Sequence, residues 1–251
     1  MNIHGKSRGK KLFGCAAVIA LASAIGMTAF VPPPLENAKA LSYNAEAAKS
    51  GWTTDFETYE EEQEYAARFN KQIVEEGAVL LKNKDGALPL TASERDITLF
   101  GTNSYKPFYG GTGSAGMTGE VKTTDLVSSL EKSGFRLNQK VQNIYNNVGG
   151  RYVAQLHSSG NIRVEIPTDL LDAAKSSYAQ YGDAAVVTIS RLGGEGYDVY
   201  HSMKTVTWGS TKAYLDENAH LLQLTDNEKT LIKHMGENFG KVIVLINSGH
   251  T

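Results

Sequence analysis

Two runs of apolar residues near the end of the chain, at residues 184–189 and 242–246, contain no polar alternation. A strand with one face in water alternates apolar and polar residues, so these continuous runs predict strands buried on both faces, as in a parallel sheet covered by helices. Residues 97–100 are a third strand candidate. The chain is therefore expected to contain a mainly parallel sheet.

Before the first of these strands, apolar residues recur at the spacing of an α-helix. Tyr65, Phe69 and Ile73 follow one another at intervals of four and predict a helix over residues 60–82 with one apolar face. Polar, small residues precede it, so residues 41–59 are expected to be a linker.

Further helices are expected between the strands. Residues 125–132 predict a helix that ends before Gly134, and residues 140–148 predict a weaker one. Residues 169–181 predict another, with Thr168 as its N-cap.

The run from Thr225 to Glu228 has the pattern of a capping box, which predicts a helix start directly before the last strand. Strand, helix and strand in this order predict a right-handed parallel crossover. The expected fold class is α/β, a three-layer sandwich with a mainly parallel sheet between helices, here within residues 60–251.

The N-terminus predicts export. Four basic residues in the first eleven precede an apolar stretch at residues 12–31, and Ala38-Lys39-Ala40 offers a cleavage site. Residues 1–40 are thus expected to be a signal peptide or, since the apolar stretch is about 20 residues long, an uncleaved hydrophobic membrane-anchor helix. The protein is expected to be secreted or extracytoplasmic.

Composition excludes several classes of function. A net charge of -2 over 251 residues provides no basic surface for nucleic acid. The single cysteine, Cys15, lies in the apolar stretch, so no disulfide framework is expected. The histidines are scattered without the spacing of metal ligands, and neither a metal nor a cofactor is predicted.

Residues 190–224 form a long connection after the strand at 184–189, at the edge of an α/β sheet where ligands bind. Glycines surround Glu195 in this connection, and Arg191, Tyr197 and Asp198 lie close to it. A cation, acids and an aromatic ring suit a polar ring such as a sugar. An ordinary turn with a solvated acid explains the same spacing equally well.

A second glycine cluster, at residues 110–116, contains a formal G-x-G-x-x-G pattern. Dinucleotide binding requires a strand directly before such a cluster and a helix directly after it. The strand at 97–100 ends about ten residues too early, and no helix opens at Gly116. The same context excludes a nucleophile elbow at Ser114.

The chain resembles the α/β-sandwich domain of family 3 glycoside hydrolases. The resemblance rests on motifs in the family's order: residues 73–83, 88–90, 97–101, 110–114, 191–198 and 242–249. It implies a retaining β-glucosidase-like enzyme in which a (β/α)8 barrel carries an aspartate nucleophile and the sandwich domain carries the acid/base glutamate. By motif, Glu195 resembles that acid/base.

The expected sugar-binding residues come from the two glycine-rich loops. They are Arg191, Tyr197 and Asp198 beside Glu195, and Gly111, Thr112, Gly113 and Ser114 in the other loop. No barrel pattern is present, so the aspartate is expected outside this chain, which alone is expected to be inactive. The sandwich is expected to be incomplete at its C-terminus, and a non-catalytic carbohydrate-binding module is the alternative.

Overall fold

The structure is a computed structural model of the chain, and its central part contains both a sheet and its covering helices. The residues that it describes are 15–17, 55–109, 124–148, 153–156, 160–192, 202–203, 216 and 218–249.

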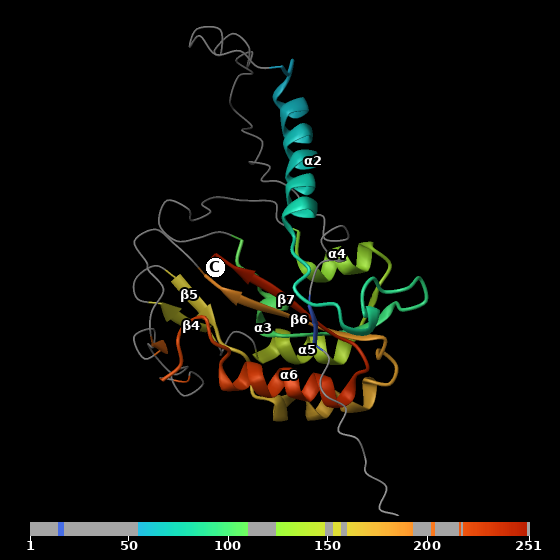
Figure 1. The fold of residues 1–251 in the computed structure, drawn as a ribbon, viewed down its shortest axis with the longest axis vertical. Coiled ribbons are helices and arrows are strands. Elements are labelled where there is room, and N and C mark those ends of the chain that lie inside the picture. The colour runs from blue at the N-terminus through green and yellow to red at the C-terminus, as the bar shows by residue number, and fades with distance from the viewer. Residues whose placement is uncertain are drawn as a thin grey trace, which may run out of the picture.

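A parallel sheet forms the middle layer (Figure 1). Its strand order is β1 (Cys15–Ala17), β7 (Val242–Ser248), β6 (Ala184–Arg191), β2 (Asp96–Phe100) and β3 (Arg136–Leu137). Every neighbouring pair in this sheet is parallel. The prediction of a mainly parallel sheet is confirmed.

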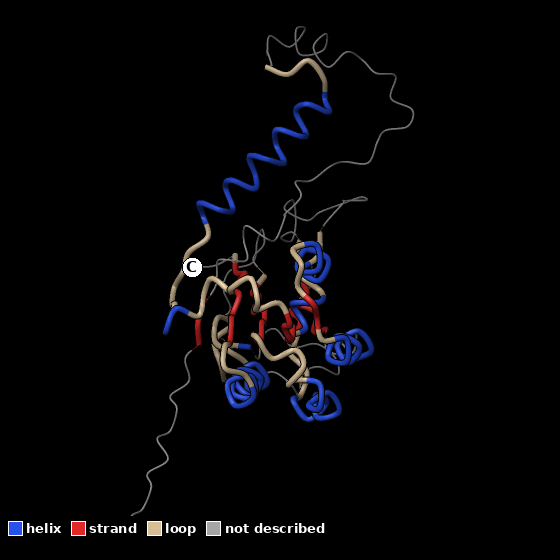
Figure 2. The backbone as a smooth tube through the Cα atoms, turned by 90° about the vertical axis from the view of Figure 1, so that its right-hand side faces the viewer, coloured by secondary structure: helices blue, strands red, loops and turns tan. Residues whose placement is uncertain are grey.

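Helices cover both faces of the sheet (Figure 2). On one face, α4 (Leu126–Lys132) packs on apolar side chains of β2, β6 and β7. On the other, α5 (Gln139–Val148), the 3-10 helix η4 (Thr168–Ser177) and α6 (Asp226–Asn238) enclose a second core. This arrangement is the predicted three-layer α/β sandwich.

Strand β6 is the centre of both cores. All eight of its residues are buried, and successive side chains point to opposite faces of the sheet. Val186 therefore packs with the α4 core, whereas Val187 and Ile189 pack with the α6 core. Burial on both faces is the physical reason for the continuous apolar run in the sequence.

Two helix predictions need correction. The first helix, α2 (Tyr59–Gly77), ends five residues before the predicted boundary at residue 82, because Ala78 already has extended backbone angles. The segment predicted as a helix from residue 169 is the 3-10 helix η4, and Thr168 does not cap it. Pro167 occupies the N-cap position, with φ -58° and ψ 139°, so Thr168 lies inside the first turn.

Several short elements were not predicted. The strands β4 (Val153–Leu156) and β5 (Gly160–Arg163) form a separate antiparallel pair. The single-turn helix α3 (Thr102–Tyr105) follows β2 after one residue, and the 3-10 turn η1 (Lys84–Gly86) lies before β2 in the chain. These elements are too short for a periodic pattern to reveal them.

Of the apolar stretch at residues 12–31, which was predicted as a helix, the structure describes only Cys15–Ala17. These residues form the strand β1, which pairs in parallel with β7. In the described part of the chain, no helix combines the length and apolar character needed to cross a bilayer. The rest of the predicted signal or anchor lies outside the described residues.

Gly101, between β2 and α3, provides a test of the packing. Its φ is +95°, and an added Cβ would lie 2.7 Å from Cγ2 of Val187. Gly101→Ala should therefore lower the free energy of unfolding by about 2–3 kcal/mol, through backbone strain and displacement of β6. Urea denaturation measures this loss.

Gly134→Ala is the matched control, because Gly134 has φ +84° but nothing within 4 Å of an added Cβ. It should cost about 1 kcal/mol, from the backbone alone. Equal losses at the two positions would show that contact with β6 does not matter.

Candidate active site at the carboxyl edge of the sheet

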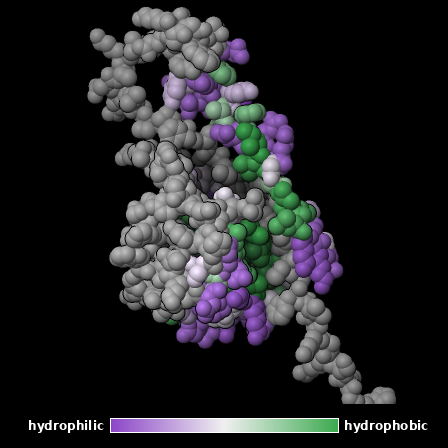
Figure 3. Space-filling view, turned by 60° about the vertical axis from the view of Figure 1, so that its left-hand side comes forward, coloured by the Kyte–Doolittle hydropathy of each residue, from purple (hydrophilic) through white to green (hydrophobic). Residues whose placement is uncertain are grey.

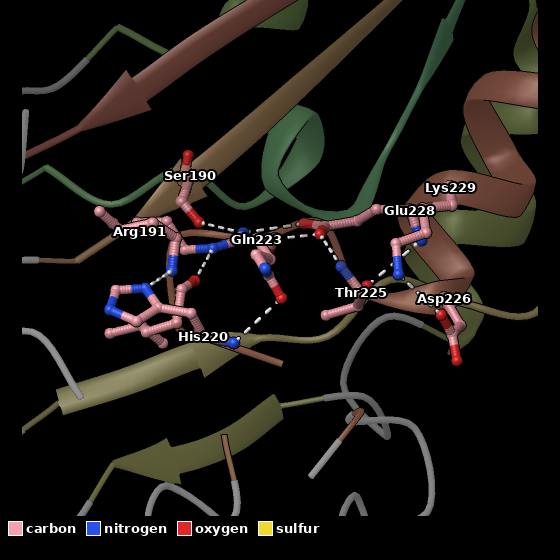
Figure 4. Close-up of polar contacts among 10 residues, drawn as sticks. Ser190, Arg191, His220, Gln223, Thr225, Asp226, Glu228 and Lys229 are labelled. Atoms are coloured by element: carbon pink, nitrogen blue, oxygen red, sulfur yellow. Dashed lines mark hydrogen bonds and ion pairs between the residues drawn. The ribbon is translucent and has the colours of Figure 1, made fainter. Parts of the chain in front are cut away.

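Arg191, the last residue of β6, uses all its guanidinium N–H groups inside the protein (Figure 4). Nη1 and Nη2 donate to the two carboxylate oxygens of Glu228 at 2.9 and 2.7 Å. Nε donates to the carbonyl oxygen of Leu221, and the remaining donors bind the carbonyls of Ser190 and Gln223. A guanidinium has five such donors, so none remains for a ligand.

Glu228 has a second function at the start of α6. Its carboxylate accepts the backbone N–H of Thr225 at 2.8 Å, and the hydroxyl of Thr225 accepts the backbone N–H of Glu228. This is the predicted capping box, and it is confirmed. The helix N-terminus favours the negative charge, and Arg191 neutralises it.

The ion pair is buried, since the side chains of Arg191 and Glu228 are only 5% and 3% exposed. Such a pair is held by its geometry and its additional hydrogen bonds, because removing two charges from water is costly. Here the carbonyls of Leu221 and Gln223 complete the hydrogen bonding. Both ends of the long segment after β6 are thereby fixed at the carboxyl edge of the sheet.

A second buried carboxylate, Glu165, lies next to this cluster. It accepts the backbone N–H of Thr102 at 2.8 Å, the hydroxyl of Tyr145 at 2.9 Å and its neighbour's N–H from Ile166 at 3.0 Å. Burial is the largest influence and raises its pKa to about 7, and the charge of Glu228 acts in the same direction. Glu165 thereby links α3 and α5 to the chain before η4.

The aromatic residues beside Glu165 are packed together. The rings of Tyr105 and Tyr145 stack with centroids 5.0 Å apart, and the Tyr105 hydroxyl donates to the carbonyl of Leu99. Burial raises the pKa of both phenols, so both remain protonated donors near neutral pH.

Unsatisfied polar atoms also gather where β2 and β6 end. Among the described residues, the buried side-chain oxygens of Thr102, Asn103, Thr188 and Ser190 find no hydrogen-bond partner. Buried polar groups are normally paired, and exceptions are concentrated at functional positions or where water binds. The carboxyl edge is therefore polar, as a binding site for hydroxyl-rich molecules requires.

The structure describes one of the predicted site residues, Arg191. Glu195, Tyr197, Asp198 and the loop of Gly111, Thr112, Gly113 and Ser114 lie outside the described residues. Contact between a sugar and any of these undescribed residues stays a prediction. Arg191 was also predicted to bind the sugar, but its five guanidinium donors are all bonded within the protein. Among the described residues, no group of His, Cys, Asp and Glu is placed to hold a metal ion.

Sequence reasoning missed Glu165 and the second role of Glu228. Glu165 has one detectable signal, a single acid between the apolar residues Val164 and Ile166. Glu228 was predicted only as part of a helix cap, since nothing in the spacing links it to Arg191, which lies 37 residues away.

Comparison with known proteins shows which protein family has this sequence and fold. The sequence model of the Glycosyl hydrolase family 3 C-terminal domain matches residues 78–251. A β-glucosidase of Ruminococcus albus is 32% identical over 188 residues, which cover 71% of this chain. β-Glucosidase A of Butyrivibrio fibrisolvens is 30% identical over 193 residues, which cover 69% of it.

Solved structures agree with these relatives. β-Glucosidase 3B of Thermotoga neapolitana, in complex with α-D-glucose, matches 79% of this chain with a TM-score of 0.55 and 26% identity. The chain is thus classed with the glycosidases. It belongs to glycoside hydrolase family 3.

This chain corresponds to only part of each relative. The match covers 17% of the Ruminococcus albus enzyme, 21% of the Butyrivibrio fibrisolvens enzyme and 26% of the Thermotoga neapolitana chain.

Removing one member of the ion pair should destabilise the domain strongly. Glu228→Gln leaves the Arg191 guanidinium buried without a counter-charge, so the free energy of unfolding should fall by about 3–5 kcal/mol. Glu237→Gln is the matched control, since Glu237 and Lys233 are 55% and 68% exposed. If urea denaturation shows equally small losses of unfolding free energy for Glu228→Gln and Glu237→Gln, the Arg191–Glu228 pair has no structural role.

Glu165 should make stability depend on pH. Its pKa in the folded state, about 7, lies above its ordinary value of 4.5, so the folded state holds the proton more tightly. The contribution of Glu165 to the free energy of unfolding should be complete below about pH 4.5. It should decline by up to about 3 kcal/mol as the pH rises to 7. Glu165→Gln should remove this decline, and an unchanged pH profile of unfolding would contradict the burial argument.

Proposed function

We propose that this chain supplies the acid/base glutamate and the sugar-contacting loops of an exported, retaining β-glucosidase-like enzyme. The observation that carries the proposal is the Arg191–Glu228 pair, which fixes the two described ends of the connection, Arg191 and residues 221–228, at the carboxyl edge of the sheet, and Glu195 lies between these ends in the sequence. In α/β folds that edge is the place for ligands. Membership of glycoside hydrolase family 3 supports the same chemistry.

The reaction needs two carboxyl groups about 5–5.5 Å apart. An aspartate of a (β/α)8 barrel attacks the anomeric carbon, while protonated Glu195 gives its proton to the leaving glycosidic oxygen. Glu195 then removes a proton from the water that hydrolyses the glycosyl-enzyme. In this scheme the barrel provides the nucleophile and this chain provides the acid/base.

The other predicted residues have separate roles in the proposal. Tyr197, Asp198 and the loop of residues 111–114 contact the sugar. Arg191 positions the segment that carries Glu195, because its donors are all bonded within the protein. Residues 1–40 direct the enzyme out of the cytoplasm, as a cleaved signal or as an anchor.

Glu195→Ala tests the proposal in an active chimera, in which residues 55–251 replace the matched region of the Ruminococcus albus β-glucosidase. The kcat/KM for glucosides with poor leaving groups should fall by about 100- to 10,000-fold, because these need a proton from the acid. Aryl glucosides with good leaving groups should retain most of the first step, and azide should restore turnover.

Glu237→Ala in the same chimera is the control, since Glu237 is exposed on α6. It should leave all rates unchanged. If Glu195→Ala also leaves them unchanged, Glu195 is not the acid/base. Binding of sugar without any effect on turnover would instead favour a non-catalytic carbohydrate-binding module.

A further inference from the structure

Arg163, the last residue of β5, carries a charge that no described carboxylate balances. Its Nε is buried and has no hydrogen-bond partner among the described residues. Burial lowers the pKa of its guanidinium, and no acid of the described chain acts in the opposite direction. A charge that is removed from water is normally paired or hydrogen-bonded. Arg163 therefore differs from Arg191, whose five donors are all bonded within the protein.

The guanidinium of Arg163 lies over an aromatic ring. Its central carbon is 4.6 Å from the centroid of the Phe108 ring, which is a cation–π distance. Both side chains are partly buried. The ring holds the cation in place, but it offers no oxygen that could accept a hydrogen bond. The contact therefore leaves the N–H donors of Arg163 unused.

Arg95 shows how a purely structural arginine contacts a ring in the same protein. Its guanidinium lies 5.0 Å from the centroid of the Phe135 ring. In addition, Nε donates to the carbonyl oxygen of Ala92 at 3.1 Å, and Nη1 donates to that of Ser133 at 3.2 Å. Arg163 has the ring without these bonds, so its donors fit a partner from outside the described chain.

Glu165 explains why Arg163 and Phe108 meet at the carboxyl edge of the sheet. Its carboxylate accepts the N–H of Thr102 at the start of α3, and Phe108 follows the end of α3 by three residues. Arg163 precedes Glu165 by two residues. The side chain of Asn227, in the first turn of α6, donates to the carbonyl oxygen of Glu165 at 2.7 Å. The segment that carries Arg163 is thus joined both to α3 and to the start of α6.

The surroundings of Arg163 favour a polar ligand. Exposed apolar residues gather along α2 and at its base (Figure 3), in other segments than Arg163 and Phe108. At α3, the buried side-chain oxygens of Thr102 and Asn103 have no hydrogen-bond partner within the described chain. An unbalanced cation beside polar groups of this kind suits a molecule that carries both a negative charge and hydroxyl groups.

We propose that Arg163 binds the carboxylate of an acidic sugar, such as a uronic acid, and that Phe108 positions its guanidinium. The paired N–H donors of a guanidinium match the two oxygens of a carboxylate, and such charge-assisted bonds are strong. That a sugar carries the carboxylate rests on the proposed function. The binding of a carboxylate at Arg163 does not depend on it.

Free phosphate is a second source of the same anionic chemistry. Proteins commonly hold phosphate with several backbone N–H groups, as at the start of a helix. At the start of α3, the N–H of Thr102 is already bonded to Glu165. A carboxylate, which a single guanidinium can hold through two parallel bonds, is therefore the better match.

The first test observes Arg163 directly in the isolated full chain by NMR. The arginines are labelled with a nitrogen isotope, and the Nε–H signal that disappears in Arg163→Gln is assigned to Arg163. D-Glucuronate should shift this signal at a concentration about tenfold lower than D-glucose or D-glucuronamide, since neither of these has a charge. If the three compounds act alike, Arg163 does not bind an anion.

Substitution gives an independent measurement by calorimetric titration, with thermal melting as the check that each variant is folded. Arg163→Gln should lower the affinity for D-glucuronate about tenfold, to that for D-glucose. Arg95→Gln is the matched control, because Arg95 also lies over a ring but has bonded donors. It should leave the affinity unchanged. Equal effects of the two substitutions would overturn the proposal.

Phe108→Leu tests the positioning role of the ring and keeps the arginine. The affinity for D-glucuronate should fall roughly two- to fivefold, because the guanidinium loses its cation–π contact. An unchanged affinity would show that the ring does not position Arg163. This variant and the NMR titration of the unaltered chain decide the question even if Arg163→Gln does not fold.

Inorganic phosphate, titrated into the same labelled chain, distinguishes the two sources of the anion. We expect it to shift the Arg163 signal only at higher concentrations than D-glucuronate. If phosphate acts at lower concentrations, the site takes a free oxyanion and the assignment to an acidic sugar is wrong.

The outcomes for Arg163 and for Glu195 are separable. If D-glucuronate binds through Arg163 but Glu195→Ala leaves turnover of the chimera unchanged, the anion site stands and the acid/base role fails. If turnover depends on Glu195 but the charged and uncharged sugars bind alike, the acid/base role stands and the anion site fails.

Discussion

The buried ion pair between Arg191 and Glu228 is the interaction on which the carboxyl edge depends. One arginine binds two carboxylate oxygens and three backbone carbonyls, and thereby connects the end of β6, the return of the long segment and the start of α6. A charge so deeply buried is tolerated only when every donor is satisfied. The same residues therefore determine both the stability of this corner and the position of the two described ends of the connection after β6.

The carboxyl edge of the sheet combines buried charged groups with unpaired polar atoms, and this combination is typical of a functional site. Glu165 and Glu228 are two buried carboxylates with one buried arginine among them, and Glu165 responds with a pKa of about 7. Hydroxyl and amide oxygens near the ends of β2 and β6 have no hydrogen-bond partner within the part of the chain that the structure describes. A core selected for stability alone would avoid both features, whereas a surface that meets a polar substrate or another domain can use them.

Much of the fold could be predicted because it follows from local patterns. The continuous apolar run of β6 reflects burial on both faces, and the capping box at Thr225 gives the start of α6. The strands β3, β4 and β5 could not be predicted, since two to four residues carry too little periodicity. The pattern predicts a helix at η4 but does not distinguish its 3-10 form from an α-helix. For the site, Arg191 could be selected by its position after a strand, but its partner Glu228 is remote in sequence and is joined to it only by the fold. The apolar face of α2 was visible as a pattern, yet its exposure in the described chain was not.

The central claim is that this chain holds one half of a catalytic pair and that a barrel holds the other. The most direct measurement is a crystal structure of the chimeric enzyme with glucose bound, and the decisive quantity is the distance between the Glu195 carboxyl group and the barrel's aspartate. We expect about 5–5.5 Å, with the sugar between the two groups, as a retaining glycosidase requires. A separation of about 6.5 Å or more, which leaves room for a water as in inverting enzymes, would contradict it.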